Sequence, residues 1–439
     1  MSEAHICCTV SSARNQSRWW TSMRIVSLVF GLWRRETRKY YAVTVLLIFM
    51  VAGFNVTSIF HQVHQTRQEP ALPKDFQESR VVKMSVDQIY KERLQYVKSE
   101  CRHSNKGSVS KIFRHDKLHI AYCPVAKIGS TFWKRVFVFL HNDTGTFSVK
   151  TPFEIPRAVV HYGKKNKTQI SPLDEYTKRT IYGNYTRFMF ARDPYSRLWS
   201  AYLDKFFLPD FWRSFALHIT RQRYDPTFEA RKCGSDVSFS EFLEYVVSLL
   251  PENMNEHWQP IQYKCDPCQF KPNIIGKQET FGDDSRYILQ GIGQEWIMNA
   301  FDHDAHVEEE LSMLIDYNFA LITKSRFYRN CTSRADIVRR LWQVFQLNGY
   351  LPIEETAESV VKKLSNTFLD RDIFKRYVLE VYRRTTVEER RALKHQRKEA
   401  IVGAYKTVPL TLIKKITEIF LNDFETFGYD TAPPNKRDT

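Results

Sequence analysis

An uncharged stretch near the N-terminus divides this chain into two parts. Residues 40–60 read YYAVTVLLIFMVAGFNVTSIF, which is 21 residues without Asp, Glu, Lys or Arg. As a helix this stretch would be about 31 Å long, close to the apolar thickness of a bilayer. A buried soluble helix would have a polar face, and this stretch has none. We therefore predict a transmembrane helix. The alternative is a cleaved signal peptide, which would have a shorter apolar core nearer the N-terminus.

The charges beside this stretch predict its orientation. Arg34, Arg35, Arg38 and Lys39 directly precede it, whereas the residues that follow it carry fewer cations. Cations concentrate on the cytosolic side of a membrane helix, so the N-terminus is expected in the cytosol and the remainder in a secretory lumen. The predicted segments are a cytoplasmic tail (1–39), a signal anchor (40–60), a lumenal stem (61–104) and a lumenal domain (105–439).

The net charge of +16 is divided unequally by the anchor. Seven of the 65 basic and two of the 49 acidic residues lie in the tail, so the rest carries 58 basic and 47 acidic residues, an excess of +11. Nucleic acid is absent from a secretory lumen, and we expect an anionic carbohydrate or nucleotide as the partner. The candidates for a glycan groove are Lys164, Lys165, Lys167, Arg179 and Lys205. A solvated basic face is the alternative, and a homo-oligomer remains open.

Cysteines and glycosylation sequons independently indicate which side of the membrane the domain occupies. Six cysteines follow the anchor: Cys101, Cys123, Cys233, Cys265, Cys268 and Cys331. An even number in an oxidising compartment predicts up to three disulfides, although Cys265 and Cys268 would also suit half of a zinc site. Sequons at Asn142, Asn166, Asn184 and Asn330 also lie beyond the anchor. Both features favour a lumenal glycoprotein domain.

The first segment that carries candidate ligand-binding residues is HIAYCPVAKIGSTFWKRVFVFL, residues 119–140. A strand is expected over residues 119–126 and an amphipathic helix from about Phe132. Lys127, Gly129 and Ser130 between them would present an ammonium, backbone N–H groups and a hydroxyl at the positive end of the helix dipole. The segment predicts an anion cradle without the Walker A pattern. An ordinary strand–helix turn with capping hydroxyls is the alternative.

The second segment is YTRFMFARDPYSRLWSAYLDKF, residues 185–206. A short strand over residues 188–191 is followed by Arg192, and Pro194 suits the first turn of a helix. Helical spacing places Ser196 and Ser200 on one face with Arg192, so Arg192 and Ser200 are candidates for gripping one phosphate. A salt-bridged helix start is the alternative.

Together these two segments resemble the sulfotransferases that use 3′-phosphoadenosine 5′-phosphosulfate (PAPS). The likeness is greatest to the Golgi carbohydrate sulfotransferases that act on chondroitin, dermatan and the HNK-1 epitope. HWQPIQYKCDPCQFKPNIIGKQET (257–280) and IFLNDFETFGY (419–429) resemble further motifs of that family, in the same order, and SFSEFLEYV (238–246) also fits. Residues 126–135 depart from the usual PKVACTNWKR, because Pro, Cys and Asn are replaced. Residues 281–406 are longer than expected for the family and are interpreted as an elaborated insertion.

The resemblance implies an α/β, P-loop-like sulfotransferase fold with a central parallel sheet flanked by helices. It implies transfer of a sulfuryl group from PAPS, without a metal, to a hydroxyl of a glycosaminoglycan or glycoprotein glycan, with a chondroitin- or dermatan-like acceptor expected. It also implies a Golgi membrane protein with a lumenal domain. The donor-binding residues carried over are Ala126, Lys127, Ile128, Gly129, Ser130, Thr131, Phe132, Arg192, Asp193, Pro194, Tyr195, Ser196, Arg197, Leu198, Trp199 and Ser200.

Three residues are candidates for catalysis. Lys127 is expected to contact the leaving phosphosulfate, with Ser130 and Thr131 at the 5′-phosphate. A base must take the proton of the acceptor hydroxyl, and histidine suits that role near neutral pH. His161 lies between the two loops, and its place in the order Lys, His, Arg resembles other sulfotransferases. His257 is the rival candidate.

Two other functions remain open on the sequence. One is a membrane-tethered glycan-binding protein that keeps the fold without catalysis. The other is a lumenal glycosyltransferase that uses a sugar nucleotide and a metal held by an Asp-x-Asp motif. Asp302-His-Asp304 is the available motif, but it lies in a polar stretch without the flanking strand expected of such a site.

Overall fold

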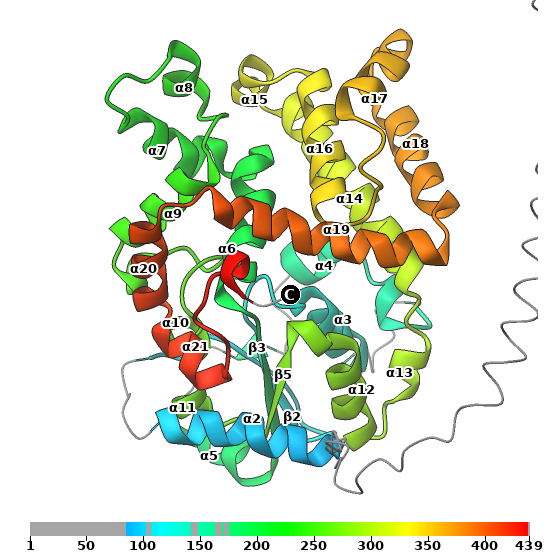
Figure 1. Ribbon diagram of the computed structural model, residues 1–439. Helices are drawn as coiled ribbons and strands as arrows, with labels where there is room; N and C mark the ends of the chain where they lie inside the picture. Colours follow the sequence, from blue (N-terminus) through cyan, green and yellow to red (C-terminus); the bar gives the residue numbers. More distant parts are fainter. Residues whose placement is uncertain (1–84, 102–106, 142–147, 163–168, 171–174, 438–439) are drawn as a thin grey trace, which may run out of the picture. The chain divides into compact units, whose positions relative to one another are not determined.

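The computed structural model describes residues 85–101, 107–141, 148–162, 169–170 and 175–437 (Figure 1). They belong to a compact unit formed by Lys83–Thr439. The predicted tail, the anchor at 40–60 and the stem up to residue 84 lie outside the described residues. Within the described ranges, no helix combines the length and apolar character needed to cross a bilayer.

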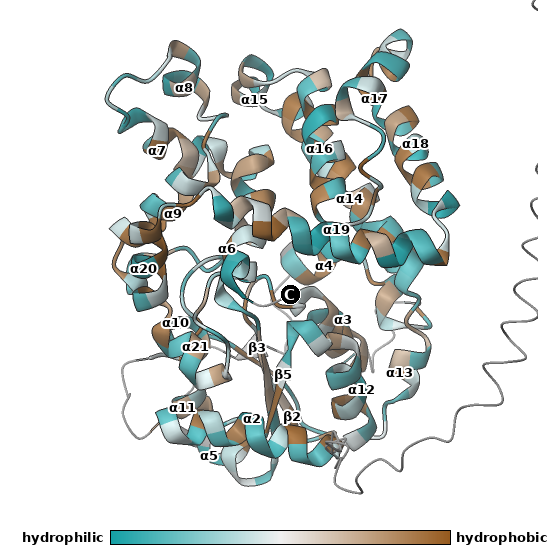
Figure 2. Cartoon of the chain, viewed as in Figure 1, coloured by the Kyte–Doolittle hydropathy of each residue, from teal (hydrophilic) through white to brown (hydrophobic). Residues whose placement is uncertain are grey.

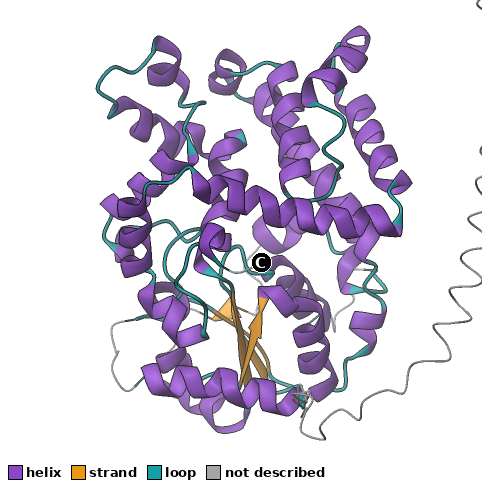
Figure 3. Ribbon diagram, in the orientation of Figure 1, coloured by secondary structure: helices purple, strands orange, loops and turns teal. Residues whose placement is uncertain are grey.

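A five-stranded sheet forms the centre of one layer (Figure 3). Its strands are β1 (Ile112–His115), β2 (Ile120–Cys123), β3 (Gln169–Ile170), β4 (Thr186–Ala191) and β5 (Ile274–Lys277), in the order β3-β1-β2-β4-β5. β2, β4 and β5 are parallel, whereas β1 is antiparallel to both β2 and β3. The prediction of an α/β fold is confirmed, and the predicted parallel sheet is found in β2, β4 and β5, but β1 makes the sheet mixed. The turn of residues 116–119 between β1 and β2 is too short for the crossover that parallel strands need.

Helices surround the sheet and build a second, largely helical layer (Figures 1 and 3). The α-helices are α2 (Val86–Glu100), α3 (Ser130–Leu140), α4 (Arg157–Tyr162), α5 (Glu175–Asn184), α6 (Pro194–Tyr202), α7 (Leu217–Arg221), α8 (Phe228–Cys233), α9 (Phe239–Ser248), α10 (Gln262–Cys265), α11 (Pro267–Phe270), α12 (Phe281–Gly291), α13 (Trp296–Asn299), α14 (His303–Lys324), α15 (Arg326–Cys331), α16 (Arg334–Leu347), α17 (Ala357–Leu364), α18 (Arg371–Arg384), α19 (Val387–Lys406), α20 (Leu410–Ile419) and α21 (Leu421–Phe427). The π-helical turns are η2 (Leu203–Phe207) and η4 (Trp212–Ala216). The 3-10 turns are η1 (Pro152–Glu154), η3 (Pro209–Phe211), η5 (Pro251–Asn253), η6 (Gln278–Thr280), η7 (Ser365–Thr367) and η8 (Pro434–Lys436).

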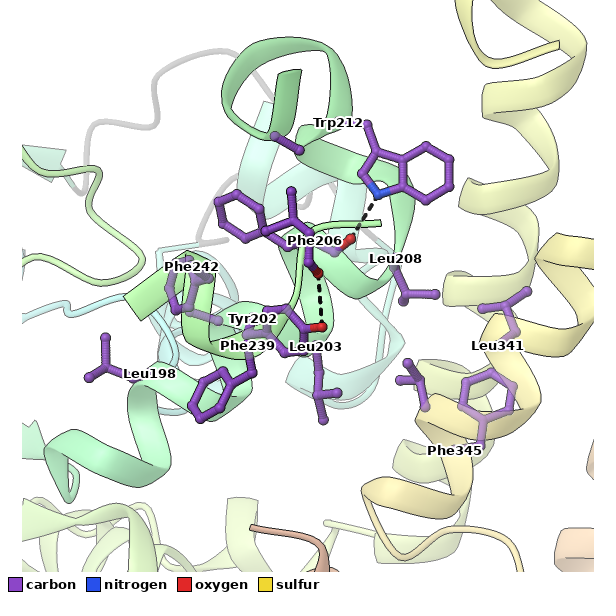
Figure 4. Packing of buried hydrophobic residues seen from close by; sticks show 14 of the residues in the cluster. Leu198, Tyr202, Leu203, Phe206, Leu208, Trp212, Phe239, Phe242, Leu341 and Phe345 are labelled. Atoms are coloured by element: carbon purple, nitrogen blue, oxygen red, sulfur yellow. Dashed lines mark hydrogen bonds between the residues drawn. The ribbon is translucent and has the colours of Figure 1, made fainter. Parts of the chain in front are cut away.

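The two layers have separate hydrophobic cores. One surrounds the strands, which appear as apolar segments in Figure 2, and includes Trp133 and Phe188. The other joins residues of α6, α7 and α9 with residues of α14, α16 and α18. In Figure 4, Leu341 and Phe345 of α16 face the same packed group as Leu203 and Leu208. The stretch 281–406, expected to be an insertion, therefore shares its core with the helices that follow β4.

The folded unit begins earlier than the sequence predicts. α2 lies within the expected stem of residues 61–104, yet Tyr90 and Val97 are buried. Arg93 forms an ion pair with Asp284 at 2.8 Å, with side chains only 12% and 4% exposed. Residues 86–100 are therefore part of the domain, because α2 packs against β5 and α21.

All six cysteines beyond the predicted anchor are paired, which confirms the expected three disulfides. The pairs are Cys101–Cys268, Cys123–Cys265 and Cys233–Cys331. Cys265 and Cys268 are thus joined to different partners, and the zinc alternative is wrong. Among the predicted sequons, Asn184 and Asn330 are exposed, while Asn142 and Asn166 lie outside the described residues.

Candidate active site

The candidate site lies where the parallel strands end. Lys127 follows β2, Arg192 follows β4, and Glu279 follows β5. Arg192 Nη1 donates to the backbone oxygen of Lys127 at 2.9 Å, and Asp193 N donates to Glu279 Oε1 at 3.1 Å. Since ligands of open α/β sheets bind at the carboxyl ends of strands, this linked set of loops is the expected place for a ligand.

The loop after β2 turns tightly at two left-handed residues. Lys127 has φ 67° and Gly129 has φ 59°. A Cβ at Gly129 would lie 2.2 Å from Phe281 Cε2, so only glycine fits this turn. Ile128 and Phe132 are buried in the sheet core, where they anchor the loop from both sides.

The N-terminus of α3 is open to an anion. The helix begins at Ser130, two residues before the predicted start, and its Gly129 cap makes no side-chain hydrogen bond. Its first turn holds no acidic residue, unlike α9, which is capped by Ser238 and Glu241. Unpaired N–H groups and the helix dipole therefore favour a negative group beside the partly exposed Ser130 and Thr131.

The start of α6 is built as the sequence predicts. Asp193 caps it by accepting from Ser196 N at 2.8 Å, and Pro194 occupies the first turn. Asp193 also pairs with Arg437 at 2.6 Å, which holds the C-terminal segment against this loop. Asp193 is thus occupied by protein groups and acts as a structural support.

The remaining residues carried over for donor binding divide into two groups. Tyr195 and Leu198 are buried in the helical core, and Ala126 supplies a backbone acceptor. Arg197 is also buried, and its guanidinium donates to the backbone oxygens of Ala126, Gln259 and Glu256 at 3.2, 2.6 and 3.1 Å. Ser196, Trp199 and Ser200 keep partial exposure. Arg197 therefore positions the loops, and the second group remains accessible to a ligand.

Arg192 lies in a cationic environment that extends beyond the predicted motif. Its side chain is buried, and desolvation together with the positive charge of Arg397 lowers its pKa to about 10. Arg397 lies on α19, a largely hydrophilic helix in Figure 2. Tyr405 Oη, at the C-terminal end of α19, donates to the backbone oxygen of Tyr195 at 2.9 Å. Sequence reasoning missed Arg397 because nothing in its local pattern distinguishes it from its basic neighbours.

The ammonium of Lys127 lies against a carboxylate that the sequence analysis did not select. Lys127 Nζ is 2.8 Å from Asp204 Oδ2, and Lys205 Nζ is 3.4 Å from the same oxygen. Asp204 and Lys205 belong to the π-helical turn η2. Such turns are rare and frequently occur at functional sites.

Both candidate histidines lie near these cations. His161 Nε2 is 3.0 Å from Thr131 Oγ1, and His257 Nδ1 is 2.6 Å from Asn255 Oδ1. Desolvation, followed by the charge of Lys134, lowers the pKa of His161 to about 3, although the residue is exposed. Burial, followed by the charge of Lys205, lowers the pKa of His257 to about 3. Both rings are therefore neutral near pH 7, as a proton acceptor must be.

A further group of cations surrounds His161. Lys134, Arg157 and Lys205 each lower its pKa by their charge. Burial, and then the charge of Lys111, lowers the pKa of Lys134 itself to about 8. Of the predicted groove residues, Lys205 lies in the site, and Arg179 lies on α5, which leads into the opposite end of β4. Lys164, Lys165 and Lys167 lie outside the described residues.

The two aspartates of the Asp-x-Asp motif, Asp302 and Asp304, make contacts with other protein groups. Asp302 caps α14 by accepting from Asp304 N and Ala305 N at 2.9 and 3.0 Å. Asp304 accepts from Arg390 at 2.6 and 2.7 Å and from Tyr382 at 2.9 Å. In the described part of the chain, no group of three or more His, Cys, Asp or Glu residues is placed to hold a metal. These aspartates therefore serve helix capping and ion pairing.

The other motifs of the resemblance are joined to the same site. Both carboxylate oxygens of Asp423 accept from Ile261 N, at 3.1 and 3.0 Å. Tyr429 Oη donates to Glu279 Oε2 at 2.9 Å. The segments 257–280 and 419–429 therefore contact each other and the loop after β5.

Comparison with known proteins gives one consistent result. Residues 110–348 match the sequence model of the Sulfotransferase family, so the first part of the stretch 281–406 lies within the match. The chain is 35% identical over 196 residues to human carbohydrate sulfotransferase 9, covering 42% of each chain. It is 36% identical over 184 residues to mouse carbohydrate sulfotransferase 11, covering 40% of this chain and 50% of that one. For zebrafish carbohydrate sulfotransferase 14 the identity is 34% over 191 residues, covering 43% of this chain and 50% of the relative.

The chain therefore spans about half the length, or less, of these relatives. No solved structure matches it. The family match covers more than half of the 439 residues and includes both loops of the candidate site. On this evidence the chain belongs to the sulfotransferase family.

Proposed function

We propose that this protein transfers a sulfuryl group from PAPS to a hydroxyl of an anionic glycan, with a chondroitin- or dermatan-like acceptor. The observation that carries the proposal is the hydrogen bond between Arg192 and the backbone oxygen of Lys127. It joins two anion-binding features, the open N-terminus of α3 and the buried Arg192. Two anionic groups on one donor, the 5′-phosphosulfate and the 3′-phosphate, suit such a pair.

The residues at this site fit the donor because they supply positive charge and hydrogen-bond donors. Ser130, Thr131 and the N–H groups of α3 would hold the 5′-phosphate. Arg192, Ser200 and Arg397 would hold the 3′-phosphate, which distinguishes PAPS from ATP. When bound, PAPS supplies the activated sulfuryl group. The ammonium of Lys127 would stabilise negative charge on the leaving phosphate oxygen, as cations do in phosphoryl transfer.

A neutral histidine would take the proton from the acceptor hydroxyl. We retain His161 as the first candidate because it contacts Thr131 at the start of α3. His257 remains the rival, since the charges of Lys127 and Asp204 both act on it. The charge of Lys205 lowers the pKa of both His161 and His257, so both rings are near Lys205, and either is compatible with the same bound acceptor.

The charge around His161 supports an acidic acceptor. Lys134, Arg157 and Lys205 come from three different elements and all act on this ring. Carboxylates or sulfates on neighbouring sugars would offset this concentration of positive charge. The three disulfides are consistent with the proposed Golgi lumen, reached through the anchor at 40–60.

The test is transfer of radiolabelled sulfate from PAPS by the full-length protein in detergent, without added Mn²⁺. The acceptor panel would contain chondroitin, desulfated dermatan, and glycans with terminal glucuronic acid or N-acetylgalactosamine, followed by disaccharide analysis of the product. We expect labelled chondroitin or dermatan. Glycan binding without turnover, and without binding of adenosine 3′,5′-bisphosphate (PAP) in calorimetry, would contradict the proposal and favour a glycan-binding protein.

A further inference from the structure

The π-helical turn η2 brings two oppositely charged residues to Lys127. η2 continues directly from α6, and Leu208 N closes it by donating to the oxygen of Leu203 at 3.1 Å. Leu203 and Phe206 are buried in the helical core, and Trp212 Nε1 donates to the oxygen of Phe206 at 2.7 Å (Figure 4). The turn is thus fixed by packing, and its two charged residues, Asp204 and Lys205, are only partly exposed.

The carboxylate of Asp204 bridges two ammonium groups. Its Oδ2 atom lies 2.8 Å from Lys127 Nζ and 3.4 Å from Lys205 Nζ. Lys205 Nζ is also 2.5 Å from Asp210 Oδ2. The side chains of Lys127, Asp204 and Lys205 are 19%, 23% and 12% exposed, so solvent screens these contacts only partly.

A purely stabilising ion pair explains this arrangement poorly. Partly buried ion pairs recover little more than the cost of desolvating their members. This one also places Lys127 and Lys205 on one oxygen, where the two ammonium groups repel each other and where Asp210 offsets the charge of Lys205 alone. The arrangement is better explained by a requirement for two cations at one place.

We propose that Asp204 is a positioning residue that holds Lys127 and Lys205 side by side as charged groups, so that both act on the transferred sulfuryl group. This inference rests on the proposed function and extends it, because Lys205 becomes a second cation of the reaction. Two ammonium groups would share the charge that develops on the leaving oxygen and on the sulfuryl oxygens.

The charge of Lys127 depends on this carboxylate. Burial lowers the pKa of Lys127, and Asp204 opposes that effect. The other charged groups that act on it are Lys205 from η2 and Arg192 from the end of β4, and both lower its pKa. Without the Asp204 carboxylate the pKa of Lys127 falls further, so the neutral amine becomes populated as the pH rises.

The test compares Asp204→Asn with the matched control Asp210→Asn in the full-length protein. Asp210→Asn removes the other carboxylate partner of Lys205 but leaves the contact with Lys127. We expect Asp204→Asn to lower kcat at least about tenfold, with a smaller change in KM for PAPS, and to lose activity as pH rises from 7 to 9. Asp204→Glu should restore part of kcat, and Asp210→Asn, which removes a partner of Lys205 alone, controls for the state of Lys127 in the measurement that follows.

A second readout does not depend on catalysis. Competitive acylation followed by mass spectrometry measures the neutral-amine fraction of Lys127, which should increase in Asp204→Asn and not in Asp210→Asn. Unchanged Lys127 reactivity together with unchanged kcat would overturn the inference. If the wild type transfers no sulfate but the reactivity changes as expected, the proposed function fails while the role of Asp204 in holding Lys127 charged stands. If Asp204→Asn does not fold, Asp204→Ala, which also removes the carboxylate, replaces it in both measurements, and wild-type values in both would overturn the inference.

Discussion

Arg192 Nη1 donates a hydrogen bond to the backbone oxygen of Lys127 at 2.9 Å, across 65 residues of sequence. The bond joins the loop after β2 to the loop after β4, which are neighbouring parallel strands. It also fixes the guanidinium that is proposed for the 3′-phosphate relative to the lysine proposed for the 5′-phosphosulfate. One contact thereby sets the relative position of the two halves of the donor site.

Replacing Arg192 should weaken donor binding strongly. For Arg192→Ala we expect a loss of about 2–4 kcal/mol in the affinity for PAP, or roughly 30- to 1000-fold, because a charged partner and the loop contact are both removed. Calorimetry of the full-length protein checks this. Arg187→Ala, near the start of β4, should change PAP affinity little, because Arg192 follows the opposite end of this strand. Equal losses in the two variants would contradict the assignment.

Replacing Lys127 should affect the chemical step more than binding. We expect Lys127→Ala to lower kcat by about 10²- to 10³-fold, as observed when a charge-stabilising donor is removed from an active site. PAP affinity should fall less, because the α3 N-terminus and Arg192 remain. Lys117→Ala, in the turn between β1 and β2, is the control. A kcat equal to that of the wild type in Lys127→Ala would refute the proposed role.

Arg397 should contribute to donor affinity although it lies outside the family match, which ends at residue 348. Arg397→Gln is expected to raise KM for PAPS about three- to tenfold with little change in kcat, since the charge acts on a part of the donor remote from the reacting bond. Arg391 is an exposed residue on the same helix, and Arg391→Gln tests whether loss of any positive charge on α19 has the same effect. Steady-state kinetics with varied PAPS would show no difference between the two variants if Arg397 is only a solvated cation.

The pH profile should lack the acidic limb of an ordinary histidine. Because the pKa of both His161 and His257 is lowered to about 3, the base of the free enzyme is neutral at every pH above about 4. We expect kcat/KM for PAPS to stay level from pH 5 to 7.5. A tenfold decline for each pH unit below 6.5 would show that the base is protonated there.

Substituting the two histidines separately would identify the base. We expect His161→Ala to lower kcat by about 10²-fold or more, and His257→Ala to lower it less. Full turnover in His161→Ala, with loss in His257→Ala, would transfer the role to His257. Thermal unfolding of both variants controls for damage to the fold.

The Cys101–Cys268 disulfide should contribute substantially to stability. It spans 167 residues and attaches α2 to the domain, and the Cys123–Cys265 disulfide lies inside this span. The double variant Cys101→Ser/Cys268→Ser is expected to lose about 3–4 kcal/mol of unfolding free energy, because a loop of roughly 25 residues, the part of the span outside Cys123–Cys265, is released in the unfolded chain. Calorimetric unfolding measures the loss, and an unchanged unfolding temperature would contradict it. PAP binding should persist at low temperature, since the disulfide is distant in sequence from both donor loops.

The sequence by itself determined the local pieces of the site. The strand before Lys127, the helix after it, and the Asp193–Pro194 start of α6 follow from apolar periodicity, glycine and proline chemistry, and helix capping, which act over a few residues. The parity of the cysteines likewise predicted three disulfides. It did not predict their pairing, because pairing depends on which distant segments meet.

Only the tertiary structure decided which charges meet. Asp204 reaches Lys127 because a π-helical turn is anchored in the helical core, and Arg397 reaches Arg192 because α19 is tied to Tyr195. The polar sequence of α2 predicts a stem, yet its few apolar residues and Arg93 have partners in the domain. Contacts between residues far apart in sequence depend on how the elements pack, and no local pattern records that packing.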